Sequence, residues 1–329
     1  MSVKSEVLNE LKKHENTYIS GQELCQKLGV SRTAVWKHIK GLKEAGYEIE
    51  SVSNRGYCLK ATPDVLGKEE LMTELETTWI GSEIHYYDTI DSTNLEAKRL
   101  AEQGAPHGTL VVADCQNQGR GRRGRAWTEQ KGTGIAMSLV LRPEIPVECS
   151  SMLTLVTALA VAEGIKDAAK VDVQIKWPND IILHGKKVCG ILTELSAQMD
   201  ELNYVIVGIG INVNIESFPE EVRDVATSLF IEQRMKINRC LLVCKVLKFF
   251  EDYYKEFVET GDLSKVMDEY NELLIHRNKP ITIVRQNQKQ EVLSLGIDQK
   301  GELMVEDASH EVYTVISGEV SIRGILGYI

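Results

Sequence analysis

Apolar residues recur three or four positions apart over the first part of the chain, which is the spacing of amphipathic helices. A first helix is predicted over residues 5–14. Ser20 and Ser31 have the positions of helix caps for the next two helices, and Gly29 has that of a helix end. The turn between the second and third helices is short, which is typical of a helix-turn-helix. The third helix is expected to bury its apolar face of Val35, Ile39 and Leu42.

A β-hairpin is predicted directly after these helices. Residues 47–52 and 57–59 have strand character, and the turn between them contains Arg55. The exposed face of the third helix carries cations and no acid before Glu44. Together these features predict a winged helix-turn-helix that binds DNA, with a module for protein contact as the alternative. DNA contacts are expected from Gln22, Ser31, Arg32, Thr33, Trp36, Lys37, Lys40 and Arg55.

Further along the chain, apolar runs of strand length alternate with helical patterns. Strands are predicted over 84–87, 109–113, 135–141, 171–176, 181–183, 187–192 and 204–211. Helices are predicted after Asn94 and over 150–169, 241–258 and 263–275. Several strands are joined by short turns, which favours a mixed or mostly antiparallel sheet flanked by helices over a Rossmann array.

The pattern changes again from Pro280, where short strands follow one another at regular spacing. They are expected over 281–284, 291–298, 302–306 and 311–316, and they predict a small SH3-like barrel. The chain is therefore predicted to be an α+β multidomain protein with domains over 1–62, 65–274 and 275–329. The first boundary is placed at Thr62-Pro63-Asp64.

The composition is that of a globular protein, with 43% hydrophobic and 26% charged residues. The net charge is −10, yet the first sixty residues hold ten Lys and Arg against seven Asp and Glu, so the front of the chain is mildly basic. The seven cysteines are scattered and form no metal-binding spacing. The start lacks an apolar signal core, and no window is expected to reach the length of a membrane helix. These features predict a cytoplasmic protein.

A run of glycines and arginines, Gly119–Trp127, carries the strongest chemical signal. Four arginines stand among three glycines, and a tryptophan closes the run. Glycine lets the backbone approach a ligand closely, and arginine forks match phosphate and carboxylate oxygens. A disordered basic tail is the alternative, although predicted strands flank the run on both sides. The spacing of the glycines also fits a dinucleotide fingerprint, but no amphipathic helix follows it.

Two further polar clusters stand at the ends of predicted strands. Lys176 follows an apolar strand and precedes the turn Trp177–Asp180, where it is either a functional cation or a snorkelling surface lysine. Asn179 and Asp180 are expected to hold that turn. Ser92 and Thr93 precede a helix, where helix capping is the alternative to ligand binding.

The order of these motifs resembles that of bacterial biotin protein ligases that double as biotin-operon repressors. The matching runs are 91–94, 116–127, 176–180, 187–194 and 208–213, and the resemblance extends over essentially the whole chain. It implies a catalytic domain like that of class II aminoacyl-tRNA synthetases. It also implies a reaction in which biotin and ATP form biotinyl-5′-adenylate, and the biotinyl group then passes to a lysine of a biotin carboxyl carrier protein, as in acetyl-CoA carboxylase and related carboxylases.

The resemblance assigns residues to this reaction. Lys176 and Arg122 are implied as catalytic, with Mg²⁺ brought by the ATP phosphates and no residue assigned as a metal ligand. Biotin contacts are implied for Ser92, Thr93, Asn94, Gln116, Arg120, Gly121, Arg122 and Lys176. Contacts to ATP or the adenylate are implied for Arg122, Arg123, Arg125, Trp127, Lys187 and Asn212. The closing run 318–323 resembles the end of the family, and its domain is either a handler of ATP or carrier or a structural cap.

Alternatives to a bifunctional ligase and repressor are a ligand-sensing transcription factor without ligase activity and a related lipoate or acyl ligase. As a repressor, the chain is expected to bind operator DNA as a homodimer when the adenylate orders the run Gly119–Trp127. The dimer surface is expected at an open sheet edge around Ile181–Leu192.

Overall fold

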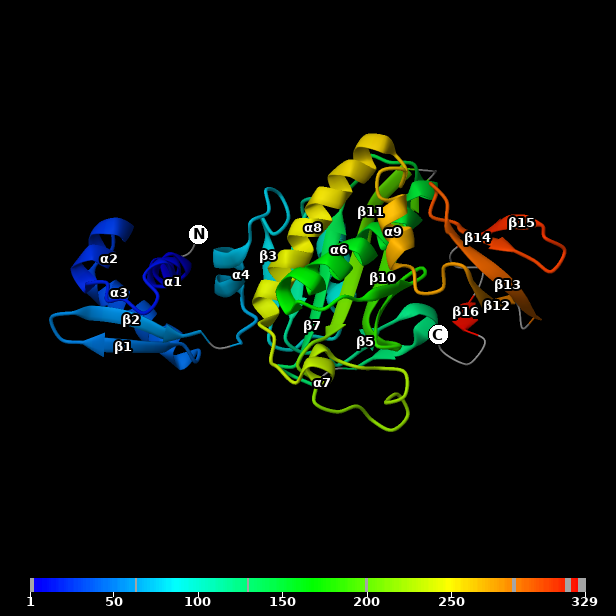
Figure 1. Cartoon of the computed structure of the whole chain (residues 1–329). Coiled ribbons are helices and arrows are strands. Elements are labelled where there is room, and N and C mark those ends of the chain that lie inside the picture. Colours follow the sequence, from blue (N-terminus) through cyan, green and yellow to red (C-terminus); the bar gives the residue numbers. More distant parts are fainter. Residues whose placement is uncertain are drawn as a thin grey trace. The chain divides into compact units, whose positions relative to one another are not determined.

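A computed structural model describes residues 3–62, 64–128, 130–198, 201–285, 288–316 and 321–324 (Figure 1). Of Ala61, Arg123 and residues 321–324 it describes the backbone alone. The predicted closing run 318–323 and the boundary residue Pro63 therefore lie partly or wholly outside the described residues. The chain divides into two compact units. One comprises residues 1–76 and 238–244, and the other 77–237 and 245–329.

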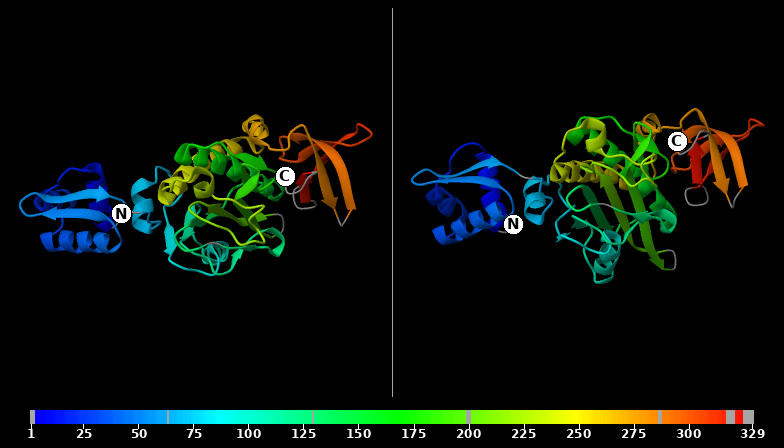
Figure 2. Two further views of the ribbon diagram at one scale, coloured as in Figure 1. Left: turned by 60° about the horizontal axis from the view of Figure 1, so that its bottom comes forward. Right: turned by 90° about the horizontal axis from the view of Figure 1, so that it is seen from below.

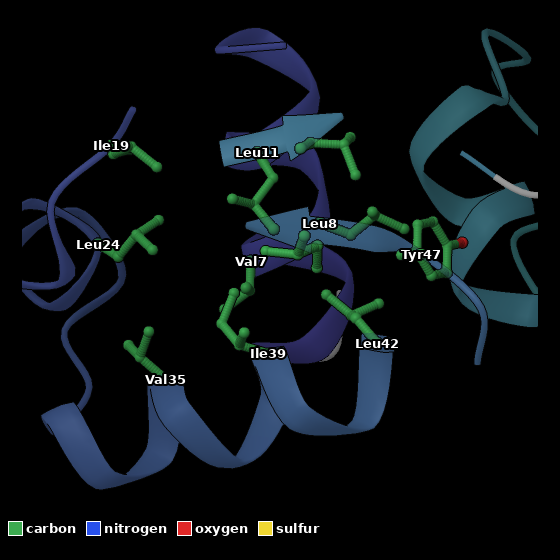
Figure 3. Packing of buried hydrophobic residues seen from close by; sticks show 11 residues of the cluster. Val7, Leu8, Leu11, Ile19, Leu24, Val35, Ile39, Leu42 and Tyr47 are labelled. Atoms are coloured by element: carbon green, nitrogen blue, oxygen red, sulfur yellow. The ribbon is translucent and has the colours of Figure 1, made fainter. Parts of the chain in front are cut away.

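The first unit has the predicted order of three helices and a hairpin. Its elements are α1 (Val3–Lys13), α2 (Gly21–Leu28), α3 (Arg32–Glu44), β1 (Glu48–Val52) and β2 (Gly56–Ala61). The predicted caps are confirmed: the hydroxyl of Ser20 accepts from Glu23 N, that of Ser31 accepts from Ala34 N, and Gly29 ends α2 in the left-handed conformation. Figure 3 shows the apolar side chains of α1 and α3 meeting in one cluster, where Val35, Ile39 and Leu42 are buried as predicted.

The first unit extends beyond the predicted boundary at residues 62–64 because buried charges tie further segments to it. Glu70 of α4 (Lys68–Glu74) is buried and accepts hydrogen bonds from Lys12 and Tyr47. Arg239, only 3% exposed, donates from Nε to Asp64 Oδ2 at 2.9 Å and from Nη2 to Asp64 O at 3.1 Å. A buried charge is costly without such partners. The pattern of apolar residues carries no sign of these pairs.

A seven-stranded sheet forms the centre of the second unit, in the order β3-β4-β7-β11-β10-β9-β8. Its strands are β3 (Ile84–Tyr87), β4 (Thr109–Ala113), β7 (Gly134–Leu141), β8 (Gln174–Lys176), β9 (Asp180–Leu183), β10 (Lys186–Gln198) and β11 (Glu201–Asn212). Only β3 and β4 pair in parallel within this sheet, so the predicted mixed, mostly antiparallel sheet is confirmed. The strand predicted over 171–176 is shorter, since regular pairing begins at Gln174.

Helices cover this sheet. Helix α6 (Met152–Ala169) follows a short 3-10 helix, η2 (Val147–Ser151), and α8 (Arg239–Thr260) packs beside it (Figures 1 and 2). A side chain at Gly164 of α6 would meet Val246 of α8 at 2.5 Å, so the glycine sets their close approach. Helix α5 (Thr93–Glu102) packs against β4, β7 and β11. A short helix, α7 (Leu229–Gln233), follows the sheet.

The expectation that no window reaches membrane-helix length is wrong by length and composition alone. The stretch Val147–Ala169 has 23 residues, and an 18-residue window within it has a mean hydropathy of 1.3. Of that window 72% is buried within the protein, however, and the buried residues of α6 lie on all its sides. A helix that is apolar all round is typical of a protein core as well as of a membrane span.

The two faces of the sheet can be told apart by strand alternation. Thr154 of α6 donates to Thr193 Oγ1 at 2.8 Å, so Thr193 lies on the face that α6 covers. Successive side chains of a strand alternate between the two faces, so the neighbouring Leu192 points to the opposite face. Gly208, which pairs with Leu192, has its Cα hydrogen on that same face. That second face is where the candidate site lies.

The expectation of an open edge around Ile181–Leu192 is wrong. Strand β9 pairs with both β8 and β10, and β10 pairs with both β9 and β11 up to Gly190. The edge strands of this sheet are β3 and β8. Beyond Gly190, β10 continues as a hairpin that pairs with β11 alone.

The C-terminal part is a five-stranded antiparallel sheet in the order β15-β14-β13-β12-β16. Its strands are β12 (Lys279–Arg285), β13 (Gln288–Ile297), β14 (Leu303–Glu306), β15 (Val312–Val315) and β16 (Ser321–Gly324). The predicted small β domain is thus confirmed as an antiparallel sheet, and its closure as an SH3-like barrel stays a prediction. The helix before it, α9 (Met267–Leu273), is shorter than the predicted 263–275. The boundary at 274–275 also stays a prediction, because both sides belong to the second compact unit.

Candidate functional site

A pocket lies on the face of the seven-stranded sheet opposite α6. Three segments surround it: the start of α5, the loop that carries the glycine–arginine run, and the middle of β10 and β11. Its lining comprises Ser92, Thr93, Asn94, Gln116, Arg120, Gly121, Arg122, Trp127, Asn179, Lys187, Gly190, Ile191, Leu192, Gly208, Ile209 and Gly210. The structure therefore brings together nine of the residues that the sequence implicates in biotin or ATP binding.

One side of the pocket is a hydrogen-bonded network built on the buried side chains of Thr93, Asn94 and Ser138. Thr93 donates from its backbone N and from Oγ1 to Gln116 Oε1, at 2.8 and 3.1 Å. The hydroxyl of Ser138, on β7, lies 2.8 Å from Thr93 Oγ1 and 2.7 Å from Asn94 Oδ1. Asn94 Nδ2 donates to Glu194 Oε2 at 2.7 Å. Each side chain is oriented by its neighbours, which fixes their donors and acceptors before any ligand arrives.

Helix capping does not explain Ser92 and Thr93. Ser92 is the cap residue of α5, but its side chain makes no capping hydrogen bond. Thr93 already lies in the helix, and its hydroxyl belongs to the network with Gln116. The capping alternative is wrong for both residues. Asp91 instead supports this corner, since its Oδ1 accepts from Ser92 N at 2.7 Å and its carboxylate pairs with Arg99. The Arg99 hydrogen bond lowers the pKa of Asp91 below its ordinary value.

Glycines form the floor of the pocket. A Cβ atom on Gly208 would lie 2.0 Å from Asn94 Oδ1, and one on Gly210 would lie 2.6 Å from the indole of Trp127. Gly190, which pairs with Gly210, would place a Cβ 2.9 Å from Lys187 Nζ and 3.2 Å from the same indole. Side chains at these three positions would collide with the residues that line the pocket. The glycines thus let Asn94 and Trp127 lie directly on the sheet.

The glycine–arginine run folds into a short two-stranded ribbon. Gly119 pairs with Trp127 and Arg120 with Ala126, so that β5 (Gly119–Arg120) and β6 (Ala126–Trp127) close a small ribbon around a 3-10 turn. Arg122, within this turn, donates from Nη1 to Asn179 Oδ1 at 2.8 Å. Asn179 also donates from Nδ2 to Ile191 O at 3.0 Å. Asn179 therefore bonds to β10 and to an arginine of the loop, and it lines the pocket, whereas its expected role within its own turn stays a prediction.

Lys187 connects the loop to the segment after β11. Its ammonium lies 2.6 Å from Asp180 Oδ1 and 5.7 Å from the ring centre of Trp127. Its backbone exchanges hydrogen bonds with Val225 O and Thr227 N, at 2.8 and 2.9 Å. A cation over an indole is a favourable electrostatic contact. Lys187 thus presents a charge to the pocket from a backbone that is fixed on both sides.

Some implicated residues do not line the pocket. Lys176 is only 7% exposed, and Asn212 is buried with its Nδ2 donating to Thr227 O at 3.0 Å. Arg125 is exposed on the loop, and the side chain of Arg123 lies outside the described residues. Near Lys176, burial together with the charges of Lys176 and Lys279 lowers the pKa of His276 to about 4.

Other site residues are absent from the sequence assignment. Ser138 lies in an apolar strand, where a single hydroxyl gives no signal of its partners. Gly190, Gly208 and Gly210 are in runs that the resemblance covers, yet their steric role follows only from strand pairing. The alternation of glycines at 208 and 210 was the one signal that could have identified the floor.

The first unit presents a separate candidate surface. Every residue predicted to contact DNA is exposed, and most of them lie on α3 or at its start. Trp36 is 56% exposed with Lys40 Nζ 5.7 Å from its ring centre. Arg55, at the tip of the hairpin, has its guanidinium 4.2 Å from the ring centre of Tyr18. An exposed helix face bearing cations and an aromatic ring is suited to a groove of DNA.

Comparisons with known proteins agree with both surfaces. The model of the biotin/lipoate A/B protein ligase family matches residues 86–212, and an HTH domain model matches residues 4–58. The bifunctional ligase/repressor BirA of Bacillus subtilis (strain 168) is 44% identical over 294 residues, which are 88% of this chain and 90% of that protein. The chain belongs to the BirA family of bifunctional ligase/repressors.

More distant members of the family are also similar. BirA of Escherichia coli (strain K12) is 28% identical over 92% of both chains. The solved biotin protein ligase from Aquifex aeolicus in complex with biotin and ATP is 32% identical, with a TM-score of 0.65 over 74% of this chain and 99% of that chain. The predicted family, its α+β fold with an N-terminal helix-turn-helix and its ligase activity are therefore confirmed, whereas the individual site residues stay predictions.

Proposed function

We propose that this chain activates biotin with ATP and transfers it to a lysine of a biotin carboxyl carrier protein, and that it represses biotin genes through its helix-turn-helix. The observation that carries the first part is the pocket, in which a fixed polar network, a glycine floor and a cationic loop surround one cavity. In the first step, a biotin carboxylate oxygen attacks the α-phosphorus of ATP, and pyrophosphate leaves. In the second step, a carrier lysine attacks the acyl carbon, and AMP leaves.

The network side of the pocket suits the ureido ring of biotin. Ser92, Thr93, Asn94 and Gln116 offer neutral donors and acceptors in fixed positions, and the close backbone at Gly121 lets the ligand approach. A neutral polar ring is bound with specificity when buried partners are already oriented toward it. The carboxylate of biotin and the α-phosphate of ATP repel each other, because both are anions. The acid end of biotin therefore requires cations from the other side of the pocket.

Cations line the other side of the pocket. Arg120, Arg122 and Lys187 line the pocket and would offset the charge of the carboxylate and the α-phosphate as they meet, with Arg123 and Arg125 following on the same loop. Trp127 offers an aromatic face to adenine. Lys176 would act from the adjacent turn, and Asn212 from the base of the segment that leads to Thr227. Mg²⁺ would enter with the ATP phosphates and supply further charge neutralisation there.

Biotin-dependent exchange of pyrophosphate into ATP tests the first step. The wild-type chain should catalyse exchange with biotin, and Lys176→Ala should reduce it sharply because one cation near the reacting groups is lost. Undiminished exchange by this variant would reject the role of Lys176. Exchange with lipoate in place of biotin would instead favour the lipoate alternative, and no exchange with either acid would favour a ligand sensor.

The carrier and the metal require separate measurements. Incubation with ATP, biotin and an isolated carrier domain should add one biotinyl group to a single lysine, as seen by intact mass. Chelation of Mg²⁺ should stop exchange, and a return of the metal should restore it. We also propose a cytoplasmic location, which the seven cysteines support, because scattered cysteines without metal-binding spacing are typical of reduced thiols, which persist in that compartment.

The repressor activity would depend on the adenylate. A single helix-turn-helix binds weakly, and dimerisation onto a two-fold operator increases its affinity. We expect the adenylate to order the loop Gly119–Trp127 and to promote a homodimer that binds the operator. A gel shift with and without biotinyl-adenylate tests this, and equal operator affinity in both would reject the switch. Equal hydrogen-exchange rates of the loop with and without adenylate would reject its ordering.

A further inference from the structure

The turn between β13 and β14, Asp298–Glu302, is closed by its own hydrogen bonds. Asp298 Oδ1 accepts from Lys300 N and from Glu302 N, both at 2.9 Å. Gly301 N donates to Asp298 O at 3.0 Å, and Gly301 has a φ of +75°, in the left-handed region that favours glycine. A turn with so many internal bonds has little freedom to change shape.

The same turn is embedded in the second unit. A side chain at Gly301 would meet Leu155 of α6 at 2.9 Å and Leu263 at 3.1 Å, so the turn occupies a gap that only glycine fits. Leu263 N donates to Gln299 O at 2.8 Å. Further along, Asn271 of α9 brackets Ile297 with two hydrogen bonds, of 2.7 and 3.2 Å. The turn is therefore a fixed point on the body that carries the pocket.

Trp177 connects this fixed point to the turn that follows Lys176. Its side chain is 2% exposed, and its Nε1 donates to Gly301 O at 3.0 Å. The residue stands directly between Lys176 and the turn residue Pro178, and Asn179 follows. Lys176 pairs with Asp180 across this turn, and Asn179 holds Arg122. One indole thus lies next to two groups that the proposed chemistry needs.

We propose that Trp177 is a positioning residue, through which the β13–β14 turn of the C-terminal sheet holds Lys176 and Asn179 in place for adenylate formation. This inference rests on the proposed function. It gives the C-terminal sheet a part in the first chemical step without any contact to a substrate. The indole acts through its N–H, since its ring would pack in the same place without that donor.

The sharpest test removes the N–H and keeps the shape. Replacement of Trp177 by benzothienylalanine, in which sulfur stands where the indole has N–H, should reduce the kcat of biotin-dependent exchange about ten-fold, because a buried carbonyl loses its donor. The dissociation constant of biotin should change less than kcat, since the network of Thr93, Asn94 and Gln116, which would hold the ureido ring, is untouched. A purely structural role would lower the Tm and the active fraction without this split.

A matched control is the same replacement at Trp79, whose ring stacks on His107 at 4.3 Å between centroids and does not line the pocket. It should leave kcat and biotin affinity unchanged. Trp177→Phe provides a second variant and should show the same direction of change as benzothienylalanine. An unchanged kcat in both Trp177 variants, with active wild-type enzyme, would reject the positioning role alone. A wild-type chain without exchange would reject both this role and the proposed function.

Discussion

The two sides of the pocket differ in how far they are built before a ligand binds. On the network side, Thr93, Asn94, Gln116 and Ser138 are joined by hydrogen bonds between 2.7 and 3.1 Å. On the cation side, Arg120 is exposed, and the buried Nε1 of Trp127 has no hydrogen-bond partner among the described residues. The network side satisfies its hydrogen bonds within the protein, whereas the cation side presents the exposed Arg120 and the N–H of Trp127.

This difference suits the chemistry of the two substrates. A neutral ring is recognised by groups that are already oriented, because their ordering then costs nothing at the moment of binding. An adenylate carries charge that the arginines of the loop Gly119–Trp127 can offset. The network side should therefore be sensitive to small steric changes, whereas the cation side should tolerate shape changes and respond to loss of charge or aromatic surface.

The largest effect is expected from Gly208→Val on the network side. Its Cβ would lie 2.0 Å from Asn94 Oδ1, so Asn94 must leave its place and the hydrogen bonds to Ser138 and Glu194 break. Overpacking of this kind costs about 1–3 kcal/mol before the lost bonds are added. We expect biotin affinity to fall about 100-fold or more, as measured by isothermal titration calorimetry.

Gly41→Ala is the matched control for this substitution. No atom lies within 4 Å of a Cβ at Gly41, which stands inside α3. Alanine in a helix is more stable than glycine by about 0.5–1 kcal/mol, so the control should raise stability slightly and leave biotin affinity unchanged. An unchanged biotin affinity in Gly208→Val would show that the floor of the pocket does not require glycine at this position.

A pH titration sharpens the description of the region beside Lys176. The ordinary pKa of histidine is 6.5, and burial with Lys176 and Lys279 lowers that of His276 to about 4. Between these values the unfolded chain binds a proton that the folded chain does not. The stability that a neutral His276 supports is thus complete above pH 6.5 and is lost as the pH falls towards 4, by up to about 3 kcal/mol.

His276→Asn should remove this part of the pH dependence. Urea unfolding at several pH values would show a flatter decline between pH 6.5 and 4 for the variant, while Ser294 keeps a hydrogen-bonding neighbour. An identical decline in both proteins would mean that His276 is not held neutral. The imidazole is 5% exposed, so screening by solvent is small.

Ser138→Ala tests the network by removing one hydroxyl. Its proton reaches Asn94 Oδ1 or Thr93 Oγ1, and its loss leaves a buried acceptor without a donor. We expect biotin affinity to fall about ten-fold with little change in the KM for ATP. Thr193→Val is the control, because it removes a hydroxyl pair with Thr154 on the opposite face of the sheet. Equal effects of the two substitutions on biotin would contradict a pre-oriented network.

The smallest effect is expected from Trp127→Phe on the cation side. Phenylalanine keeps an aromatic face over Gly210 but has less area and no buried N–H. The KM for ATP should rise about three- to five-fold, in line with the energy of an aromatic contact, and biotin affinity should not change. A larger loss of biotin affinity than of ATP affinity would contradict the assignment of the Trp127 indole to adenine.

Local chemistry predicts the elements of this fold well. Ser20 and Ser31 cap helices because their hydroxyls satisfy backbone donors within three residues, which is a property of the sequence itself. The run Gly119–Trp127 stands out by its own glycines and arginines, and the resemblance to the family then assigns its residues and Ser92–Asn94 to ligand binding. Ser92–Asn94 and four residues of the run, Arg120, Gly121, Arg122 and Trp127, line one pocket in the structure.

The remaining features depend on contacts between distant residues. Ser138 is 45 residues from Thr93, and nothing near it in the chain indicates that its hydroxyl faces the pocket. The extra length of β10 and the pairing of β9 on both sides follow from the sheet order, which refuted the predicted open edge. The pairing of Arg239 with Asp64 spans 175 residues and moved the limit of the first unit.

The first compact unit is assembled from two separate stretches of chain, 1–76 and 238–244, and α8 passes from it into the second unit. A chain shortened to begin at residue 65, the predicted start of the second domain, would lack Asp64 and leave Arg239 as a nearly buried guanidinium without that carboxylate. Cys240, Leu242 and Val243, all buried, would lose part of the unit to which they belong. The helix-turn-helix unit therefore includes the start of α8. A ligase shortened by this unit would need a redesigned start to α8.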